Sequence, residues 1–184
     1  MQRPFAAFAS ALALCGALVA ASPALAALKV GDKAPDFTAP AALAGKDFNF
    51  KLADALKKGP VVLYFFPAAY TSGCTAEAHE FAEATPEFEK LGATVIGVTA
   101  GAVDRIKDFS KEHCRDKFAV AAANPALIKS YDVSMGIPLK PLTNRTSYVI
   151  APSGKILLAY TDGNFAGHVT QTMDAVKAYK ATKK

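Results

Sequence analysis

The chain has 184 residues, a formal net charge of +5 and 52% hydrophobic residues, a composition that fits one globular domain. Its lysines are scattered apart from a small cluster at the C-terminus, and no basic stripe carries interleaved aromatic residues. The positive charge therefore gives no indication of a nucleic-acid partner.

The N-terminal segment has the pattern of a secretory signal peptide. Arg3 is its only charged residue, an apolar run covers residues 5–21, and the small-residue stretch Ala24-Leu25-Ala26 follows. This pattern predicts cleavage after residue 26, export to the bacterial periplasm, and one domain over residues 27–184 that has no membrane attachment after cleavage. An uncleaved anchor is the alternative, because the apolar run is near the lower limit for a membrane span.

Strand and helix patterns alternate along the rest of the chain. In order, we expect a hairpin over 41–52, a helix over 51–58, a strand over 60–66, a helix that Thr71 or Ser72 caps and Gly92 ends, a strand over 94–99, a helix over 103–114, a strand over 118–122, a helix over 124–131 that Asn124 caps, a hairpin over 146–160 and a helix over 168–179. Pro86 should kink or divide the helix that contains it. This order predicts an α/β fold with a mixed central sheet flanked by helices on both faces.

One cysteine, Cys74, lies where a strand leads into a helix. The preceding apolar run over residues 61–66 is typical of a strand buried on both faces. Backbone N–H groups and the positive end of the dipole at the start of a helix stabilise a thiolate. The position therefore favours a reactive cysteine, and a buried core cysteine is the alternative.

The other cysteines limit the redox chemistry. Cys15 would leave with the signal peptide, so the mature chain would keep Cys74 and Cys114. One pair in an exported protein is either a structural disulfide or a redox couple, and composition does not separate these two. The setting of Cys74 favours the couple.

The residues around Cys74 resemble the peroxidatic motif of the peroxiredoxins. The motif reads Pro67-x-x-x-Thr71-x-x-Cys74 at the end of the predicted strand. Residues 91–98 and 144–150 resemble later strands of the family, and the second of these carries Arg145 at the position of the family's active-site arginine.

Spacing and length are closest to the bacterioferritin-comigratory, or peroxiredoxin Q, branch of this family. The resemblance covers roughly residues 28–179. It implies a thioredoxin-like fold of peroxiredoxin type, with an N-terminal β-hairpin and a mixed central sheet. It also implies a peroxidase that uses neither a metal nor an organic cofactor.

The resemblance implies a role for each motif residue. Cys74 would attack a peroxide oxygen as a thiolate and become a sulfenic acid. Arg145 would hold the thiolate and donate hydrogen bonds to the peroxide. Thr71 would bind the peroxide through its hydroxyl, and Pro67 would shield the site from water. The structural alternatives are a surface arginine, a helix-capping threonine and a proline that ends a strand.

The family also suggests how the sulfenic acid is reduced. Many relatives of this branch carry a resolving cysteine five residues after the peroxidatic one, but this chain has His79 there. Cys114 is the remaining candidate, and we expect a Cys74–Cys114 disulfide. A single-cysteine peroxidase with Cys114 as a spectator is the alternative. The implied partners are a peroxide and a thioredoxin-like or small-thiol reductant, and the implied assembly is a monomer.

Three other functions are alternatives to a peroxidase. A thiol–disulfide oxidoreductase on the same fold would need a second cysteine three residues after the first, where this chain has Glu77. A non-enzymatic partner protein is the second. The third alternative is a copper- or zinc-binding module. Its candidate ligands lack the spacing of a zinc finger, and they are Cys74, His79, His113 and Cys114. His168 is expected to lie at a helix start without a role.

Overall fold

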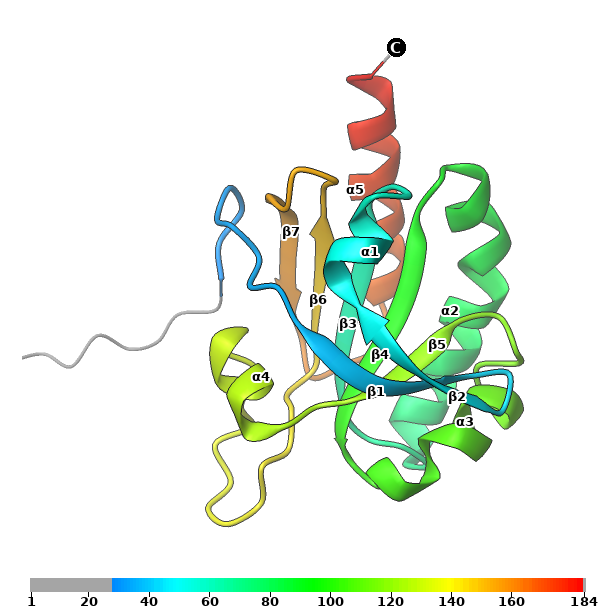
Figure 1. The fold of residues 1–184 in the computed structure, drawn as a ribbon, viewed down its shortest axis with the longest axis vertical. Coiled ribbons are helices and arrows are strands. Elements are labelled where there is room, and N and C mark those ends of the chain that lie inside the picture. The colour runs from blue at the N-terminus through cyan, green and yellow to red at the C-terminus, as the bar shows by residue number, and fades with distance from the viewer. Residues whose placement is uncertain (1–27, 184) are drawn as a thin grey trace, which may run out of the picture.

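A seven-stranded sheet in the order β2-β1-β5-β4-β3-β6-β7 forms the centre of the protein (Figure 1). The computed structural model describes residues 28–183, so the predicted signal peptide over residues 1–26 lies outside the described residues. The strands are β1 (Thr38–Leu43), β2 (Lys46–Lys51), β3 (Val61–Ala68), β4 (Thr94–Gly101), β5 (Ala119–Ala122), β6 (Thr146–Ile150) and β7 (Ile156–Thr161). The helices are α1 (Leu52–Leu56), α2 (Ser72–Lys90), the 3-10 turn η1 (Val103–Arg105), α3 (Ile106–Glu112), α4 (Pro125–Ser130) and α5 (His168–Ala181).

The sheet combines a parallel centre with antiparallel margins. Strands β3, β4 and β5 are parallel, whereas β1 pairs antiparallel with β5 and β6 pairs antiparallel with β3. The β1–β2 hairpin turns at Ala44 and Gly45, whose φ angles of 51° and 72° are those of a two-residue turn that matches the twist of the strands. The predicted mixed sheet flanked by helices is thus confirmed.

Strand β3 separates two hydrophobic cores. Val61, Leu63 and Phe65 face the side covered by α1 and α4. The intervening residues, Val62, Tyr64 and Phe66, face the side covered by α2, α3 and α5. Successive side chains of a strand point to opposite faces, so an uninterrupted hydrophobic run fills both cores and holds the C-terminal end of β3 in place.

The predicted hairpin over 41–52 begins earlier, at Thr38, and two features of the helices also differ from the expectation. The predicted helix over 103–114 begins as the 3-10 turn η1 and ends at Glu112, so Cys114 follows the helix instead of lying on it. Helix α2 runs without a break through Pro86. Phe81 and Phe88 of α2 are fully buried on either side of this proline, and tertiary packing of such a face stabilises a helix more than local propensity does.

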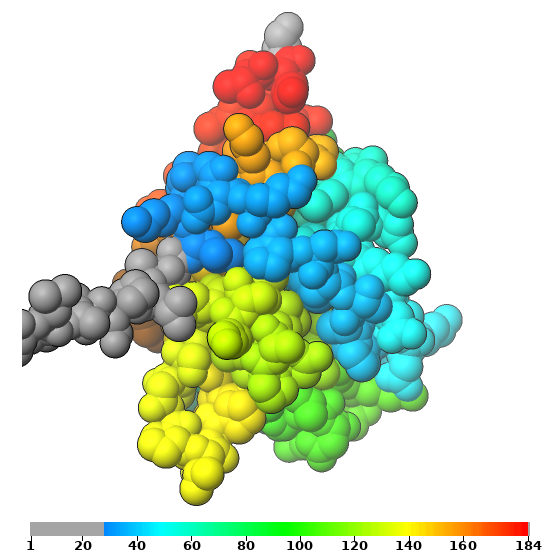
Figure 2. Space-filling view, turned by 60° about the vertical axis from the view of Figure 1, so that its left-hand side comes forward, coloured from blue at the N-terminus to red at the C-terminus, as the bar shows by residue number. Residues whose placement is uncertain are grey.

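Residues 134–142 form a loop that projects from the body of the protein, coloured yellow in Figure 1 and Figure 2. Met135, Ile137 and Leu139 are exposed on it. A bridge between Ser134 and Thr143 closes the base of the loop, next to the strand that begins at Thr146. No helix within residues 28–183 has the length and apolar character needed to cross a bilayer.

Candidate active site

The loop between β3 and α2 delivers Cys74 into the first turn of α2. Thr71 occupies the N-cap position, and Cys74 is the third residue of the helix. The cysteine is buried and packs in the same core as Tyr64 and Phe66. Its sulfur therefore lies among apolar side chains at the end of a helix where backbone N–H groups lack partners within the helix, a setting that stabilises negative charge.

Strand pairing brings Arg145 to this cysteine from far along the chain. Phe65 of β3 pairs with Thr146 of β6, so Arg145, one residue earlier, lies at the end of β3 where the cysteine loop begins. Its Nη2 atom lies 3.6 Å from the Sγ atom of Cys74. The arginine is itself buried, which weakens the screening of its charge by water.

Pro67 and Thr71 bracket the loop that carries the site. Pro67 is half-buried, and its carbonyl accepts a hydrogen bond of 3.1 Å from the hydroxyl of Thr99. Thr71 is exposed, and its hydroxyl donates to the carbonyl of Ala68 at 3.1 Å. Thr71 is the N-cap residue of α2, as expected, but its side chain makes no capping hydrogen bond.

Gly73 leaves space beside the guanidinium. A Cβ atom at this position would lie 3.5 Å from Nη2 of Arg145 and 3.9 Å from the ring of Phe165. A methyl group there would occupy the gap between these two side chains. The missing side chain therefore leaves a small space next to the arginine and one residue from Cys74.

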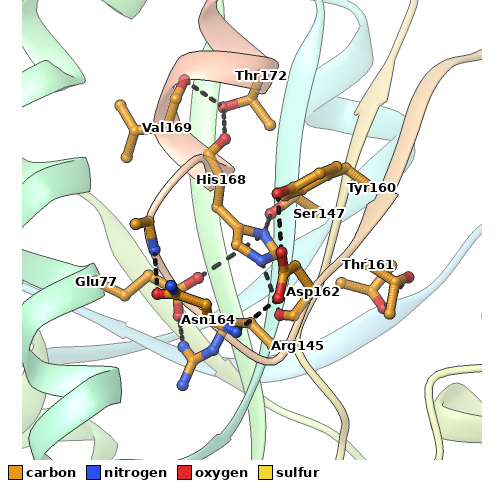
Figure 3. Close-up of polar contacts among 12 residues, drawn as sticks. Glu77, Arg145, Ser147, Tyr160, Thr161, Asp162, Asn164, His168, Val169 and Thr172 are labelled. Atoms are coloured by element: carbon orange, nitrogen blue, oxygen red, sulfur yellow. Dashed lines mark hydrogen bonds and ion pairs between the residues drawn. The ribbon is translucent and has the colours of Figure 1, made fainter.

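Glu77 was not recognised as a site residue from the sequence. It lies one helical turn after Cys74, is fully buried, and pairs through Oε2 with Nη1 of Arg145 (Figure 3). The Nε atom of Arg145 donates to the carbonyl of Gly163 at 3.2 Å. The guanidinium is thus held on two sides while its third nitrogen faces the cysteine. The sequence signal for a role of Glu77 is its place three residues after Cys74, on the same face of the helix.

Burial raises the pKa of Glu77 to about 8, against the opposing effect of the Arg145 charge. At neutral pH the carboxyl is therefore mostly protonated, and it accepts a hydrogen bond from Arg145 without cancelling its charge. The positive charge remains available to the sulfur of Cys74. Above the pKa, a carboxylate at Glu77 would compete with the thiolate for the same guanidinium.

We expect Glu77 to make the free energy of unfolding fall as the pH rises between about 4.5 and 8. The unfolded carboxyl releases its proton near 4.5 and the folded one near 8, so in this window the folded state binds more protons and a rise in pH destabilises it. The loss should be on the order of 1.4 kcal/mol for each pH unit. Urea unfolding of the wild type and of Glu77→Gln across this window measures it.

The glutamine variant keeps the shape and the hydrogen-bond acceptor of the protonated acid but does not titrate. The difference between the two proteins therefore isolates Glu77 from the other carboxylates. Equal pH dependence in both proteins would contradict the assignment of a high pKa to this group.

His168 lies at a helix start, as expected, but the structure gives it contacts that the sequence did not indicate. It is the first residue of α5 and is fully buried. Its Nδ1 atom lies 2.8 Å from Oγ of Ser147 and its Nε2 atom 3.1 Å from the carbonyl oxygen of Asp162 (Figure 3). A helix start requires neither burial nor these two contacts.

Cys114 is a buried thiol in the same apolar core as Cys74, and both cysteines are free. Its backbone N–H closes the last turn of α3 on the carbonyl of Phe109. Burial raises the pKa of the Cys114 thiol well above its usual value. The thiol is therefore protonated while it remains in this core.

The structure brings two of the candidate metal ligands together. Nε2 of His79 lies 3.2 Å from Nδ1 of His113. This contact joins α2 to the end of α3. Within residues 28–183, however, no three histidine, cysteine or acidic side chains are arranged to hold a metal ion. The two imidazoles form a hydrogen-bonded pair, and burial lowers the pKa of His79.

Comparison with known proteins extends these observations. A model of the AhpC/TSA family matches residues 30–159. Peroxiredoxin Bcp from Xanthomonas campestris pv. campestris is 30% identical over 132 residues, which cover 65% of this chain and 77% of that protein. Chloroplastic peroxiredoxin Q from Sedum lineare is 28% identical over 125 residues, or 67% of each chain.

Solved structures of similar proteins have the same fold. The crystal structure of peroxidoxin BcpB from Mycobacterium tuberculosis has a TM-score of 0.73 and 29% identity, and the match covers 82% of this chain and 97% of that one. A mutant of PrxQ from Xylella fastidiosa has a TM-score of 0.71 and 26% identity, over 84% and 98% of the two chains.

Proposed function

The chain belongs to the AhpC/TSA family and is a thiol-dependent peroxidase, and from this premise we propose that Cys74 is its peroxidatic residue. The observation that carries the proposal is the 3.6 Å approach of Arg145 Nη2 to Cys74 Sγ in the first turn of α2. A buried cation beside a sulfur at a helix start favours the thiolate, which is the reactive form.

The reaction follows from the chemistry of this pair. The Cys74 thiolate attacks one peroxide oxygen, the O–O bond breaks, and a sulfenic acid forms. The departing oxygen carries the electron pair away and takes up a proton, to leave as water or an alcohol. Arg145 stabilises the charge that moves from sulfur to this oxygen, and the Thr71 hydroxyl orients the peroxide at the exposed side of the site.

We propose that Cys114 then resolves the sulfenic acid. Its sulfur attacks the sulfur of Cys74, a disulfide forms, and the sulfenic oxygen leaves as water. Both cysteines belong to the apolar core between the sheet and α2, α3 and α5. Because Cys114 lies past the end of α3, the segment after Glu112 can move without unwinding the whole helix.

One equivalent of peroxide tests both cysteine assignments. Peptide mapping after this treatment should find Cys74 linked to Cys114, because an adjacent thiol captures a sulfenic acid before further oxidation. With Cys114→Ser, a sulfenic-acid trap should label Cys74. Wild-type protein that carries trapped sulfenic acid at Cys74 and no linkage would contradict the resolving role, and no oxidation at Cys74 would contradict the peroxidatic role.

The alternative thiol–disulfide exchange role has less support. The position three residues after Cys74 carries Glu77, whose carboxyl contacts Arg145. An exchange enzyme would need a sulfur there.

We further propose the setting in which the enzyme acts. Its substrates are hydrogen peroxide or organic hydroperoxides, and its reductant is a thioredoxin-like protein or a small thiol. The signal-like segment over residues 1–26 supports export to the bacterial periplasm. We propose a monomer, because the contact between Arg145 and Cys74 forms within a single chain.

A further inference from the structure

We infer that His168 is a positioning residue for Arg145, which it holds in place through residues 162–163. The inference rests on the proposed function, because it concerns the orientation of Arg145 toward Cys74. It is carried by the hydrogen bonds of the His168 ring and by the complete burial of that ring.

The contacts of the ring define its tautomer. A carbonyl oxygen only accepts hydrogen bonds, so Nε2 of His168 must donate to Asp162. In a neutral ring the other nitrogen is then an acceptor, and the hydroxyl of Ser147 donates to Nδ1. A ring with both nitrogens engaged is fixed in orientation.

The segment that His168 holds is the one that holds Arg145. The backbone N–H of Asp162 donates to the carbonyl of Arg145 at 3.3 Å, and the next carbonyl, from Gly163, accepts from Nε of Arg145. The carbonyl that accepts from His168 and the carbonyl that accepts from Arg145 therefore belong to consecutive residues, Asp162 and Gly163. A shift of this turn would move Arg145 relative to the sulfur 3.6 Å from Nη2.

His168 also faces the second group that holds the arginine. Its Nδ1 atom lies 3.9 Å from Oε1 of Glu77, while Oε2 of the same carboxyl pairs with Arg145. Among the described residues, Oε1 has no hydrogen-bond partner. A proton on Nδ1 would bring a positive charge to within 3.9 Å of this carboxyl and disturb its contact with Arg145.

The start of α5 is shaped to allow this placement. Gly167 precedes His168 with φ of 101°, a backbone conformation that side chains rarely adopt. A Cβ atom at Gly167 would lie 3.0 Å from the hydroxyl of Tyr160, whose ring packs against the imidazole with centroids 4.8 Å apart. The glycine lets the chain turn so that the first side chain of the helix points into the core.

Charged and titratable groups surround the ring. Glu77 faces it from α2, Arg145 from the start of β6, and Tyr160 and Asp162 from β7 and the turn after it. Burial lowers the pKa of His168 and the Arg145 charge acts in the same direction, against the opposing effects of the hydrogen bond to the Asp162 carbonyl and of the Asp162 charge. The neutral ring therefore persists somewhat below the usual titration range of histidine, and acid would disturb the site once the ring charges.

Substitution at His168 tests the inference in the full protein, with peroxide consumption followed under dithiothreitol. His168→Leu should lower kcat/KM by about 10- to 100-fold, a loss typical of a displaced catalytic group. His168→Gln has an N–H that can reach the Asp162 carbonyl and should recover most of the rate. The ultraviolet absorbance of the Cys74 thiolate should fall in the leucine variant and return in the glutamine variant.

A matched packing variant separates positioning from stability. Val176→Ala removes buried volume from the same helix, so it should lower Tm while kcat/KM is kept. An equal loss of rate in Val176→Ala and His168→Leu at equal Tm, or a glutamine variant as slow as the leucine one, would overturn the inference.

A measurement on the wild type covers the case in which His168→Leu does not fold. Nitrogen NMR of the histidine side chains at neutral pH should show His168 as a neutral ring with its proton on Nε2. A charged ring, or a proton on Nδ1, would overturn the inference. Failure of the proposed function is distinct, because the wild type would then consume no peroxide at all.

Discussion

Cys74→Ser is expected to reduce peroxide consumption to the rate of the buffer alone. The hydroxyl of serine is far less acidic than a thiol and oxygen has no counterpart to the sulfenic acid, so the attack on the O–O bond is lost. We expect a loss of at least about 10³-fold, which corresponds to about 4 kcal/mol of activation free energy. The measurement is peroxide consumption by the protein without residues 1–26, with dithiothreitol as electron donor.

Cys114→Ser is the matched control, because it removes the other buried thiol. It should still consume one equivalent of peroxide, and further turnover should then depend on the external thiol. Peroxidase activity that survives in Cys74→Ser but disappears in Cys114→Ser would exchange the roles of the two cysteines and contradict the mechanism.

Arg145→Ala is expected to cost far more rate than its effect on thiolate content explains. Lowering a thiol pKa from about 8.5 to about 6 raises the ionised fraction at neutral pH about 30-fold, but the weaker nucleophile loses roughly 10-fold. Ionisation therefore contributes only a few-fold. The remaining acceleration must come from orienting the peroxide and stabilising the departing oxygen, and removal of one such donor typically costs about 10²- to 10³-fold.

The test compares two measured losses in the same variant. The fraction of Cys74 present as thiolate comes from ultraviolet absorbance, and kcat/KM comes from peroxide consumption. Arg145→Lys keeps the charge but not the planar fork, so it should retain thiolate content better than rate. If the two losses are equal in Arg145→Ala, orientation by the guanidinium is not the source of the acceleration.

Local sequence patterns predicted most of the fold correctly. The run over residues 61–66 is hydrophobic throughout because β3 supplies alternate residues to two cores. Asn124 and Pro125 marked the start of α4, where the Asn124 side chain accepts from the backbone N–H of Leu127. These signals depend on neighbours within a few residues, which a sequence displays directly.

The differences from the expectation concern helix ends and the helix interior around Pro86. The helix predicted through Cys114 ends at Glu112, and the Thr71 hydroxyl bonds to Ala68 although its residue type suits a helix cap. Pro86 does not divide α2, since buried residues on both sides hold that helix against the sheet.

The sequence by itself determined the order of the elements, the family resemblance and the position of Cys74 at the mouth of a helix. Only the tertiary structure decided which groups surround its sulfur. Glu77 and His168 received no role from the sequence, because an acid on a helix and a histidine at a helix start are common on protein surfaces. The pairing of β3 with β6 and the packing of α5 behind them bury both residues beside Arg145. Burial raises the pKa of Glu77 and lowers that of His168, and burial is a property of the folded chain.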